Sequence, residues 1–337
     1  MSDYTIVWAD PQPGQEVEFA RGLLPAQGFT IAAPAGESDT ELRILLAGAD
    51  AILTQRRPID AGLLAAAPEV RLIQKYGRRE DGLDLDAARR AGVTVAMMPL
   101  RGCIAVAELA VTLMLALSKQ LVQAHRDTTT GAYRQLGLAP SRTTQRQFAF
   151  QWMKLPHLAE LNGKTLGIIG YGEIGTEVSV RARALGMTVL YTKHSPLPPP
   201  IEARLGVTWA DRQTILRESD VVLLSMPHTA ETERMIGAAE LDLMKSSAHL
   251  VNIARGGLID EEALYAALSE RRIAGAGLDV FVEEPVPADN PLLQLDNVIL
   301  TPHIGGGTGG ARVKQMTDVL ENIVRAARGE TPHHILV

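Results

Sequence analysis

The stretch TLGIIGYGEIG, residues 165–175, decides the fold. It places Gly170, Gly172 and Gly175 in a G-x-G-x-x-G pattern, directly after an apolar strand and directly before a helical pattern. In such a turn the first glycine permits the bend, the second lets the backbone approach a pyrophosphate, and the third lets the helix pack on the strand. The helix N-terminus then offers its N–H groups to the anion. We expect a dinucleotide-binding turn; a purely structural glycine turn is the alternative.

Apolar strand-like runs alternate with helical patterns on both sides of this turn. The runs before it are TIVWA (5–9), AILTQ (51–55), LIQKY (72–76) and VTVAMM (93–98), and those after it are MTVLY (187–191), DVVLLSMP (220–227), HLVNIA (249–254), GAGLDV (275–280) and NVILTPH (297–303). Repeated strand–helix units indicate a parallel sheet covered on both faces. The sequence therefore predicts an α/β protein with two doubly wound parallel-sheet domains.

The two alternating series are separated by a different kind of segment. A helical pattern runs from Ile104 to about His125, and a polar stretch with few apolar repeats follows it from residue 126 to about 160. We interpret this stretch as an arm or surface excursion that a partner subunit could order.

Length and composition restrict the possible functions. The chain has 337 residues, enough for two domains, and a net charge of −6 with 46% hydrophobic and 21% charged residues, which gives no overall electrostatic reason to bind nucleic acid or an anionic membrane. The acidic start MSDYTIVWAD is unlike a secretory signal, and the longest apolar run, residues 104–117, is short for a membrane span. The single cysteine, Cys103, excludes an internal disulfide and a cysteine-based metal site. We expect a cytoplasmic protein without a metal.

The strand VLY (189–191) continues into TKHSP, where an NAD-binding protein usually has an acidic residue about 20 residues beyond the glycines. This chain has Lys193, His194 and Ser195 there. A ribose 2′-phosphate would be repelled by a carboxylate and attracted by an ammonium group. We therefore expect NADP(H) to be preferred. In the alternative interpretation Lys193 points into solvent, the ribose is held by backbone, and NAD(H) is possible.

Three polar residues follow strands of the second series: Arg255, Glu284 and His303. Reduction of a carbonyl leaves charge on oxygen, which a positioned histidine can protonate at neutral pH. A carboxylate beside the imidazole would stabilise and orient its protonated form, and an arginine can hold a substrate carboxylate. Each has a structural alternative: Arg255 could brace a loop, Glu284 could cap a turn, and His303 could be a buried histidine whose hydrogen bonds are made within the protein. Together, after a dinucleotide turn, they favour hydride transfer to a keto acid.

The segments GKTLGIIGYGEIG, VNIARGGLIDEEAL and AGLDVFVEEPVPADNPLLQLDNVILTPHIGG closely resemble the NAD(P)-dependent D-2-hydroxyacid dehydrogenase family. The resemblance implies that Arg255 orients the substrate, that Glu284, the glutamate before Pro285, is the partner carboxylate, and that His303 is the acid/base. It also implies interconversion of 2-oxo and D-2-hydroxy acids, a homodimer built around the nucleotide domain, and a cleft between two domains.

The same resemblance implies the domain boundaries. Residues 1–98 and 306–337 would form a flavodoxin-like substrate domain, and residues 99–305 a Rossmann dinucleotide-binding domain that includes helix 104–125 and arm 126–160. Besides the glycines and residues 193–195, we expect six further residues to line the cofactor site: Glu173, Ile174, Pro227, Thr232, Ala254 and Asp279.

The chain departs from the family pattern in the substrate loop. GRREDGLD (77–84) retains Gly77 but has Arg79 in place of a second glycine. We expect the substrate to be bound by residues of this loop and its neighbourhood: Tyr76, Gly77, Arg78, Arg79 and Arg101. The three arginines would favour a substrate with a second anionic group; alternatively, they are solvated surface residues.

The sequence thus predicts an NADPH-preferring reductase of small 2-oxo acids such as glyoxylate or hydroxypyruvate. Two alternatives stay open. One is a cofactor-sensing regulatory protein on the same fold, and the other is a dehydrogenase of another small anion, formate or phosphite.

Overall fold

The computed structural model describes residues 3–78, 80, 82–146, 150–306 and 311–337. The chain divides into two compact units, Met1–Ile104 with Thr308–Val337 (unit 1) and Ala105–Gly307 (unit 2). The predicted domain boundaries, 98/99 and 305/306, lie a few residues from these limits. The assignment of substrate binding to unit 1 stays a prediction.

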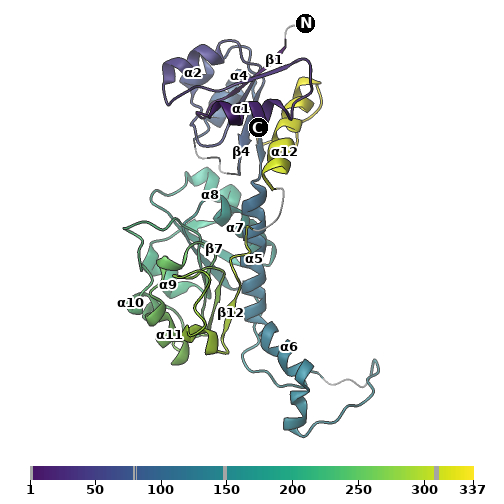
Figure 1. Cartoon of the computed structure of the whole chain (residues 1–337), viewed down its shortest axis with the longest axis vertical. Helices are drawn as coiled ribbons and strands as arrows, with labels where there is room; N and C mark the ends of the chain where they lie inside the picture. Colours follow the sequence, from purple (N-terminus) through teal and green to yellow (C-terminus); the bar gives the residue numbers. More distant parts are fainter. Residues whose placement is uncertain (1–2, 79, 81, 147–149, 307–310) are drawn as a thin grey trace. The chain divides into compact units, whose positions relative to one another are not determined.

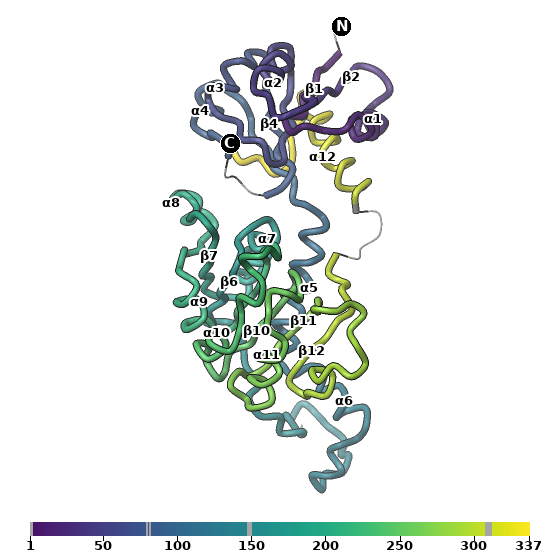
Figure 2. Tube along the Cα trace, turned by 60° about the vertical axis from the view of Figure 1, so that its left-hand side comes forward, coloured from purple at the N-terminus to yellow at the C-terminus, as the bar shows by residue number. Residues whose placement is uncertain are grey.

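Unit 1 is built on a five-stranded sheet in which every pairing between named strands is parallel, in the order β2-β1-β3-β4-β5. Helix α12 packs on this sheet through buried residues such as Val319 and Ile323 (Figure 2). The elements are β1 Tyr4–Trp8, α1 Gly14–Arg21, β2 Phe29–Ala32, α2 Asp39–Leu46, β3 Ala51–Thr54, α3 Ala61–Leu64, β4 Leu72–Tyr76, α4 Leu85–Ala91, β5 Thr94–Met98 and α12 Ala311–Ala327.

Unit 2 is built on a seven-stranded parallel sheet in the order β12-β11-β10-β9-β6-β7-β8 (Figure 1). Its strands are β6 Thr165–Ile169, β7 Thr188–Thr192, β8 Thr208–Trp209, β9 Val221–Leu224, β10 His249–Asn252, β11 Gly275–Leu278 and β12 Val298–Leu300. Its helices are α5 Arg101–Ser118, which starts in unit 1, α6 Leu121–Thr130, α7 Glu173–Ala184, α8 Pro199–Leu205, α9 Arg212–Glu218, α10 Ala238–Leu243, α11 Glu261–Ser269 and the 3₁₀ helices η1 Ala132–Leu136, η2 Gly256–Leu258 and η3 Pro291–Gln294.

Each sheet has one point at which the strand order reverses, between β1 and β3 in unit 1 and between β6 and β9 in unit 2. The chain winds outward from that point in both directions, which defines a doubly wound sheet. The predicted fold class is therefore confirmed. Ligands of such sheets bind outside the carboxyl ends of the strands at the reversal. In unit 2 we therefore expect the ligand site at the loops after β6, β9 and β10.

The segment between the two alternating series differs from its prediction. The single helix expected from Ile104 to about His125 is wrong, because α5 ends at Ser118 and α6 begins at Leu121. Gln120 interrupts the helix with a left-handed backbone (φ 47°), and its side-chain amide donates to the carbonyl oxygen of Pro156. Figure 1 shows α6 and the chain after it extending away from the unit 2 sheet.

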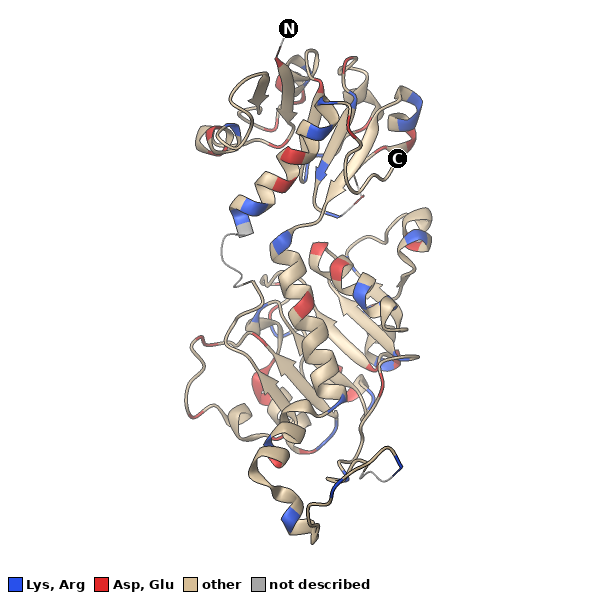
Figure 3. Cartoon of the chain, turned by 90° about the vertical axis from the view of Figure 1, so that its right-hand side faces the viewer, with Lys and Arg blue, Asp and Glu red and all other residues tan. Residues whose placement is uncertain are grey.

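Helix α5 is, within the described residues, the one helix whose length and composition would suit a membrane span. It carries a buried face that includes Ala110, Leu113 and Leu117, and this face packs in the core of unit 2 together with β6 and β9. Such packing is that of a core helix. In the described part of the chain, acidic and basic residues are interspersed on both units (Figure 3).

Candidate active site

The glycine turn after β6 has the geometry of a cradle for an anion. Gly170 has φ 96°, and a Cβ added to it would lie 2.4 Å from Met226 Cβ, so the turn requires glycine. A Cβ on Gly175 would lie 3.1 Å from the carbonyl oxygen of Gly170, because α7 packs tightly on the turn. A Cβ on Gly172 would meet no protein atom within 4 Å. The position where the backbone must admit a pyrophosphate is therefore the open one.

Helix α7 begins directly at this open position. Gly172 is its N-cap and supplies no side-chain hydrogen bond, and the first N–H groups of a helix have no partner among the carbonyls of the helix itself. Glu173 and Ile174 form the first turn, and Ile174 packs against the core beneath. These features fit a dinucleotide, whose diphosphate would bind at the amino end of α7.

The loop after β7 holds Lys193, His194 and Ser195. Lys193 is half-buried and the other two are exposed, with His194 Nδ1 3.5 Å from Ser195 Oγ. The buried Tyr191 closes this loop, since its hydroxyl donates to Glu202 Oε1 (2.7 Å) and accepts from the Leu197 N–H (2.7 Å). Burial, followed by the hydrogen bond to Glu202, raises the pKa of Tyr191. No acidic residue stands between Tyr191 and Leu197.

Arg255 lies on the loop between β10 and η2. The buried Asn252 shapes this loop, because its amide donates to the carbonyl of Arg255 (2.8 Å) and its oxygen accepts from the N–H of Ala254 (3.0 Å). A Cβ on Gly256 would lie 1.9 Å from the carbonyl carbon of Phe281. The glycine therefore lets the Arg255 loop press against the loop that carries Glu284.

The side chains of Glu284 and His303 form a hydrogen bond. Glu284 Oε2 lies 2.6 Å from His303 Nδ1, and Glu284 Oε1 accepts from the backbone N–H of Phe281 (3.0 Å). Burial raises the pKa of Glu284, but the hydrogen bonds from His303 and Phe281 and the charge of Arg255 together lower it below its usual value. The carboxylate is thus ionised at neutral pH, and the His303 side chain, 48% exposed, leaves Nε2 for a substrate.

Asp279 shapes the loop that carries His303. It is 2% exposed, and its oxygens accept hydrogen bonds from Thr301 Oγ1 (2.6 Å), the Ile304 N–H (2.9 Å) and the Gly305 N–H (2.9 Å). The loop holds His303 with φ 54°, an unusual conformation for a residue with a side chain. The structure therefore gives Asp279 a role in holding the loop; its predicted cofactor contact stays a prediction.

The other predicted cofactor residues lie on loops at the carboxyl edge of the same sheet. Thr232 Oγ1 donates to the carbonyl of Pro227 (3.0 Å) and closes the loop after β9. Ala254, in the Arg255 loop, is buried, and its carbonyl accepts from the Arg255 guanidinium (2.6 Å). Pro227 and Thr232 thus lie in the loop after β9, and Ala254 lies in the loop after β10.

Sequence reasoning missed Asn252 and Glu261, the two side chains that fix the loops around Arg255 and Glu284. Glu261 accepts from the Val282 N–H (2.8 Å) and from the amide of Asn290 (3.0 Å), and so holds the segment on either side of Glu284. Asn252 could have been found, since it is a polar residue at the end of an apolar strand.

The predicted substrate residues belong to unit 1. Tyr76 is half-buried at the end of β4, Gly77 follows with φ 126°, and Arg78 is half-buried. Arg101 is bound by helix α12, because its Nε donates to Asp318 (2.5 Å), which raises the pKa of the guanidinium. Arg79 lies outside the described residues. The role of these residues in substrate binding stays a prediction.

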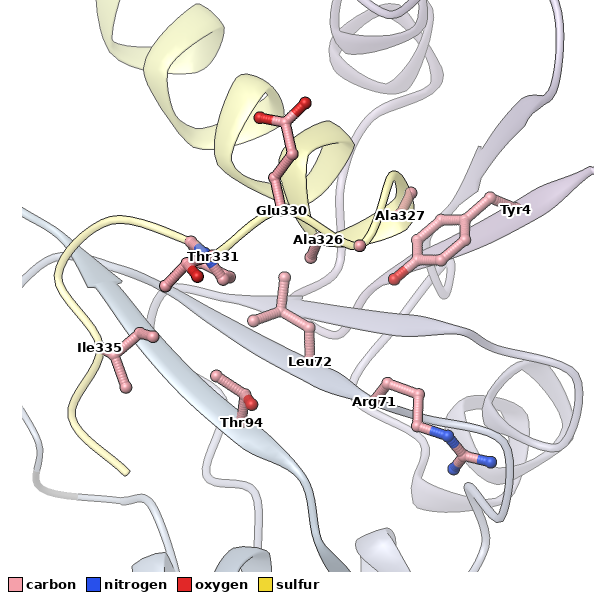
Figure 4. A pocket seen from close by; sticks show the side chains of 11 residues that line it. Tyr4, Arg71, Leu72, Thr94, Ala326, Ala327, Glu330, Thr331 and Ile335 are labelled. Carbon is pink, nitrogen blue, oxygen red and sulfur yellow. The ribbon is translucent and has the colours of Figure 1, made fainter.

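Unit 1 also has an open groove of about 400 Å³ between the end of α12 and the sheet (Figure 4). Tyr4, Leu72 and Thr94, which line it, are the first residues of β1, β4 and β5. The groove is therefore at the amino ends of the strands, opposite to the edge where doubly wound sheets bind ligands. It is not the candidate site.

Comparison with known proteins agrees with this geometry. Residues 111–305 match the family described as D-isomer specific 2-hydroxyacid dehydrogenase, NAD binding domain. The chain is 40% identical over 285 residues to the glyoxylate reductase of Thermococcus kodakarensis, which covers 84% of this chain and 81% of that protein. Among solved structures, a glyoxylate reductase from Paecilomyes thermophila is similar with a TM-score of 0.55 and 29% identity over 99% of this chain and 98% of that chain.

A second solved structure, an acyclic imino acid reductase in complex with NADPH and D-arginine, has a TM-score of 0.53 and 26% identity over 99% of this chain and 100% of that chain. The family match covers more than half of the chain and includes the glycine turn, Arg255, Glu284 and His303. The chain belongs to the D-isomer specific 2-hydroxyacid dehydrogenase family and is an oxidoreductase with a nicotinamide-cofactor domain.

Proposed function

We propose that this protein reduces a small 2-oxo acid of the glyoxylate or hydroxypyruvate type to the corresponding D-2-hydroxy acid, with NADPH as the preferred hydride donor. The observation that carries the proposal is the 2.6 Å hydrogen bond between Glu284 and His303, with the loop of Glu284 packed against the loop of Arg255. This set can bind a carboxylate and protonate a carbonyl oxygen, which is what the reduction requires.

When bound, the nicotinamide cofactor supplies the hydride that is transferred to the carbonyl carbon. Arg255 would hold the substrate carboxylate by charge-assisted hydrogen bonds. His303 would donate a proton from Nε2 to the carbonyl oxygen as negative charge develops there. Glu284 keeps Nδ1 in place through the 2.6 Å hydrogen bond and so orients the ring. One hydride and one proton added to the 2-oxo acid give the 2-hydroxy acid, and the same groups serve the reverse reaction.

The preference for NADPH rests on the loop after β7. Lys193 brings a positive charge, with His194 and Ser195 as further hydrogen-bond donors, and the loop contains no carboxylate that would repel a 2′-phosphate. The solved complex of the imino acid reductase contains NADPH, so a protein of similar fold binds this cofactor.

Initial rates of NADPH and NADH oxidation test both parts of the proposal, with glyoxylate, hydroxypyruvate, pyruvate and a phenyl-substituted 2-oxo acid as substrates. We expect turnover of the small acids and a preference for NADPH that Lys193→Asp removes. Lys119→Asp is the control, because it makes the same charge change at an exposed lysine after α5. Equal efficiency with NADH would refute the cofactor preference, and absence of turnover with every 2-oxo acid would refute the reductase.

We further propose that the protein is a homodimer that uses the arm. Among the described residues of the arm (126–160), four large apolar side chains are exposed in the single chain, Phe150 by 86%: Leu136, Leu138, Phe150 and Leu158. Exposed apolar surface of this kind favours a protein interface. Light scattering after size exclusion should give twice the mass of 36.3 kDa, and a monomer mass would refute the dimer.

A further inference from the structure

The loop after β9 contacts the Arg255 loop through His228. A Cβ built on Gly257 would lie 2.6 Å from both Cε1 and Nε2 of the His228 imidazole. The ring therefore lies directly against the backbone of Gly257, two residues after Arg255. Any side chain at position 257 would have to displace the ring.

The imidazole is fixed in this position by its own loop. His228 Nε2 is paired with Glu233 Oε2. The next residue, Arg234, donates its backbone N–H to the carbonyl of Gly257 (2.7 Å), and Ile236 donates to the carbonyl of Leu258 (3.1 Å). The loop 228–236 thus contacts Gly257 twice, by the ring on one side and by a backbone hydrogen bond at the carbonyl.

The Arg255 loop also contacts the Glu284 loop, because Gly256 lies against the carbonyl of Phe281. The Asn252 side-chain amide donates to the carbonyl of Arg255 (2.8 Å). At Gly257 the contact comes from a side chain of an exposed loop, the His228 imidazole. Loss of that ring would remove the side-chain contact with Gly257 and leave the backbone hydrogen bonds from Arg234 and Ile236 to hold this part of the loop.

From these contacts we infer that His228 is a positioning residue, which Glu233 holds against Gly257 and which keeps Arg255 in place for the substrate carboxylate. The inference rests on the proposed role of Arg255. It assigns no chemical step to the imidazole. It also implies that the loop with the predicted cofactor residues Pro227 and Thr232 supports the loop that binds the substrate.

The first test compares His228→Ala with Glu231→Ala in the full-length protein. Glu231 is exposed and lies in the same loop, so it controls for a general disturbance of this loop. We expect His228→Ala to raise KM for glyoxylate about tenfold, because a small displacement of a binding group weakens binding strongly, while the Kd for NADPH changes less than about twofold. An unchanged KM in His228→Ala, with an active wild-type protein, would overturn the inference.

A second test does not depend on turnover. In His228→Ala, hydrogen exchange of the amides of residues 254–258 should become at least about tenfold faster, since the loop has lost a contact, and exchange in α7 should stay the same. Unchanged exchange in the loop would overturn the inference. Failure of the proposed function would instead be seen in the wild-type protein, as absence of 2-oxo acid reduction.

The variant Gly257→Ala gives a third, independent comparison. Its Cβ would push on the His228 ring, so the variant alone should raise KM for glyoxylate. In the His228→Ala background the same substitution meets an empty space, and its effect on KM should be smaller by a factor of about five or more. Equal effects in both backgrounds would show that the ring does not press on Gly257.

Discussion

Replacement of Gly172 by alanine should separate cofactor binding from folding. Gly172 has an extended backbone (φ −110°, ψ −153°) that does not require glycine, and an added Cβ meets no protein atom within 4 Å. A glycine-to-alanine change at a tolerant position alters stability by less than about 1 kcal/mol, because the main effect is on the unfolded chain. We therefore expect the Tm of the ligand-free protein to change by no more than about 4 °C.

The same methyl group should weaken cofactor binding strongly. It would occupy the space in which the pyrophosphate approaches the first N–H groups of α7. Loss of one hydrogen bond to a charged group costs about 1.5–3 kcal/mol. This loss raises Kd by roughly 10- to 100-fold. Isothermal titration calorimetry with NADPH and NADH, together with thermal unfolding without cofactor, measures both quantities on the same samples.

Gly170→Ala is the matched control at the other end of the turn. It must place a side chain at φ 96° and 2.8 Å from the backbone nitrogen of Met226. Strain and overpacking together should destabilise the protein by about 2–5 kcal/mol and lower the Tm by at least about 4 °C. The reasoning is refuted if Gly172→Ala binds both cofactors as tightly as the wild type, or if it loses as much stability as Gly170→Ala.

Three further predictions concern ionisable groups. Glu284→Gln should lower kcat/KM about 100-fold with little change in the cofactor Kd, because His303 loses its charged partner. Folding lowers the pKa of Glu284, so the wild type should also lose stability relative to the variant as the pH falls below about 4.5. Parallel acid-unfolding curves of the two proteins would contradict this second expectation. Tyr191→Phe removes the hydroxyl that closes the loop at Leu197. We expect this variant to bind NADPH about tenfold more weakly and to lose less of its affinity for NADH. Equal losses of affinity for the two cofactors in fluorescence titrations would show that the hydroxyl does not position the 2′-phosphate site. Burial, with the charge of Asp50 as the second cause, raises the pKa of Tyr4 to about 12, so stability should fall as the pH rises from 10 to 12, and urea unfolding should show a smaller fall in Tyr4→Phe.

The sequence was informative wherever a residue acts through its immediate neighbours in the chain. The glycine turn needs only a strand before it and a helix after it, and both are local patterns. Strand LIQKY coincides with β4, Leu72–Tyr76, for the same reason. The end of α5 was missed, because the interruption at Gln120 depends on a hydrogen bond to Pro156, 36 residues further on.

The candidate site was predictable in its residue types but not in its supports. Glu284 and His303 were expected to meet, and they lie 2.6 Å apart in the structure. Asn252 and Glu261 escaped notice because they act on backbone groups of other loops, for which no spacing rule exists. Arg101 shows the opposite limit: a charged residue near a predicted site can have a distant partner, here Asp318, 217 residues along the chain.

The way in which Tyr191 closes the loop after β7 has a practical consequence for enzyme engineering. The hydroxyl of one buried residue binds both Leu197, where the loop ends, and Glu202 in the following helix. Residues 193–196 therefore form a short segment that can be substituted while Tyr191 and Leu197 hold its two ends. A library restricted to these four positions could search for altered coenzyme use without repacking the sheet.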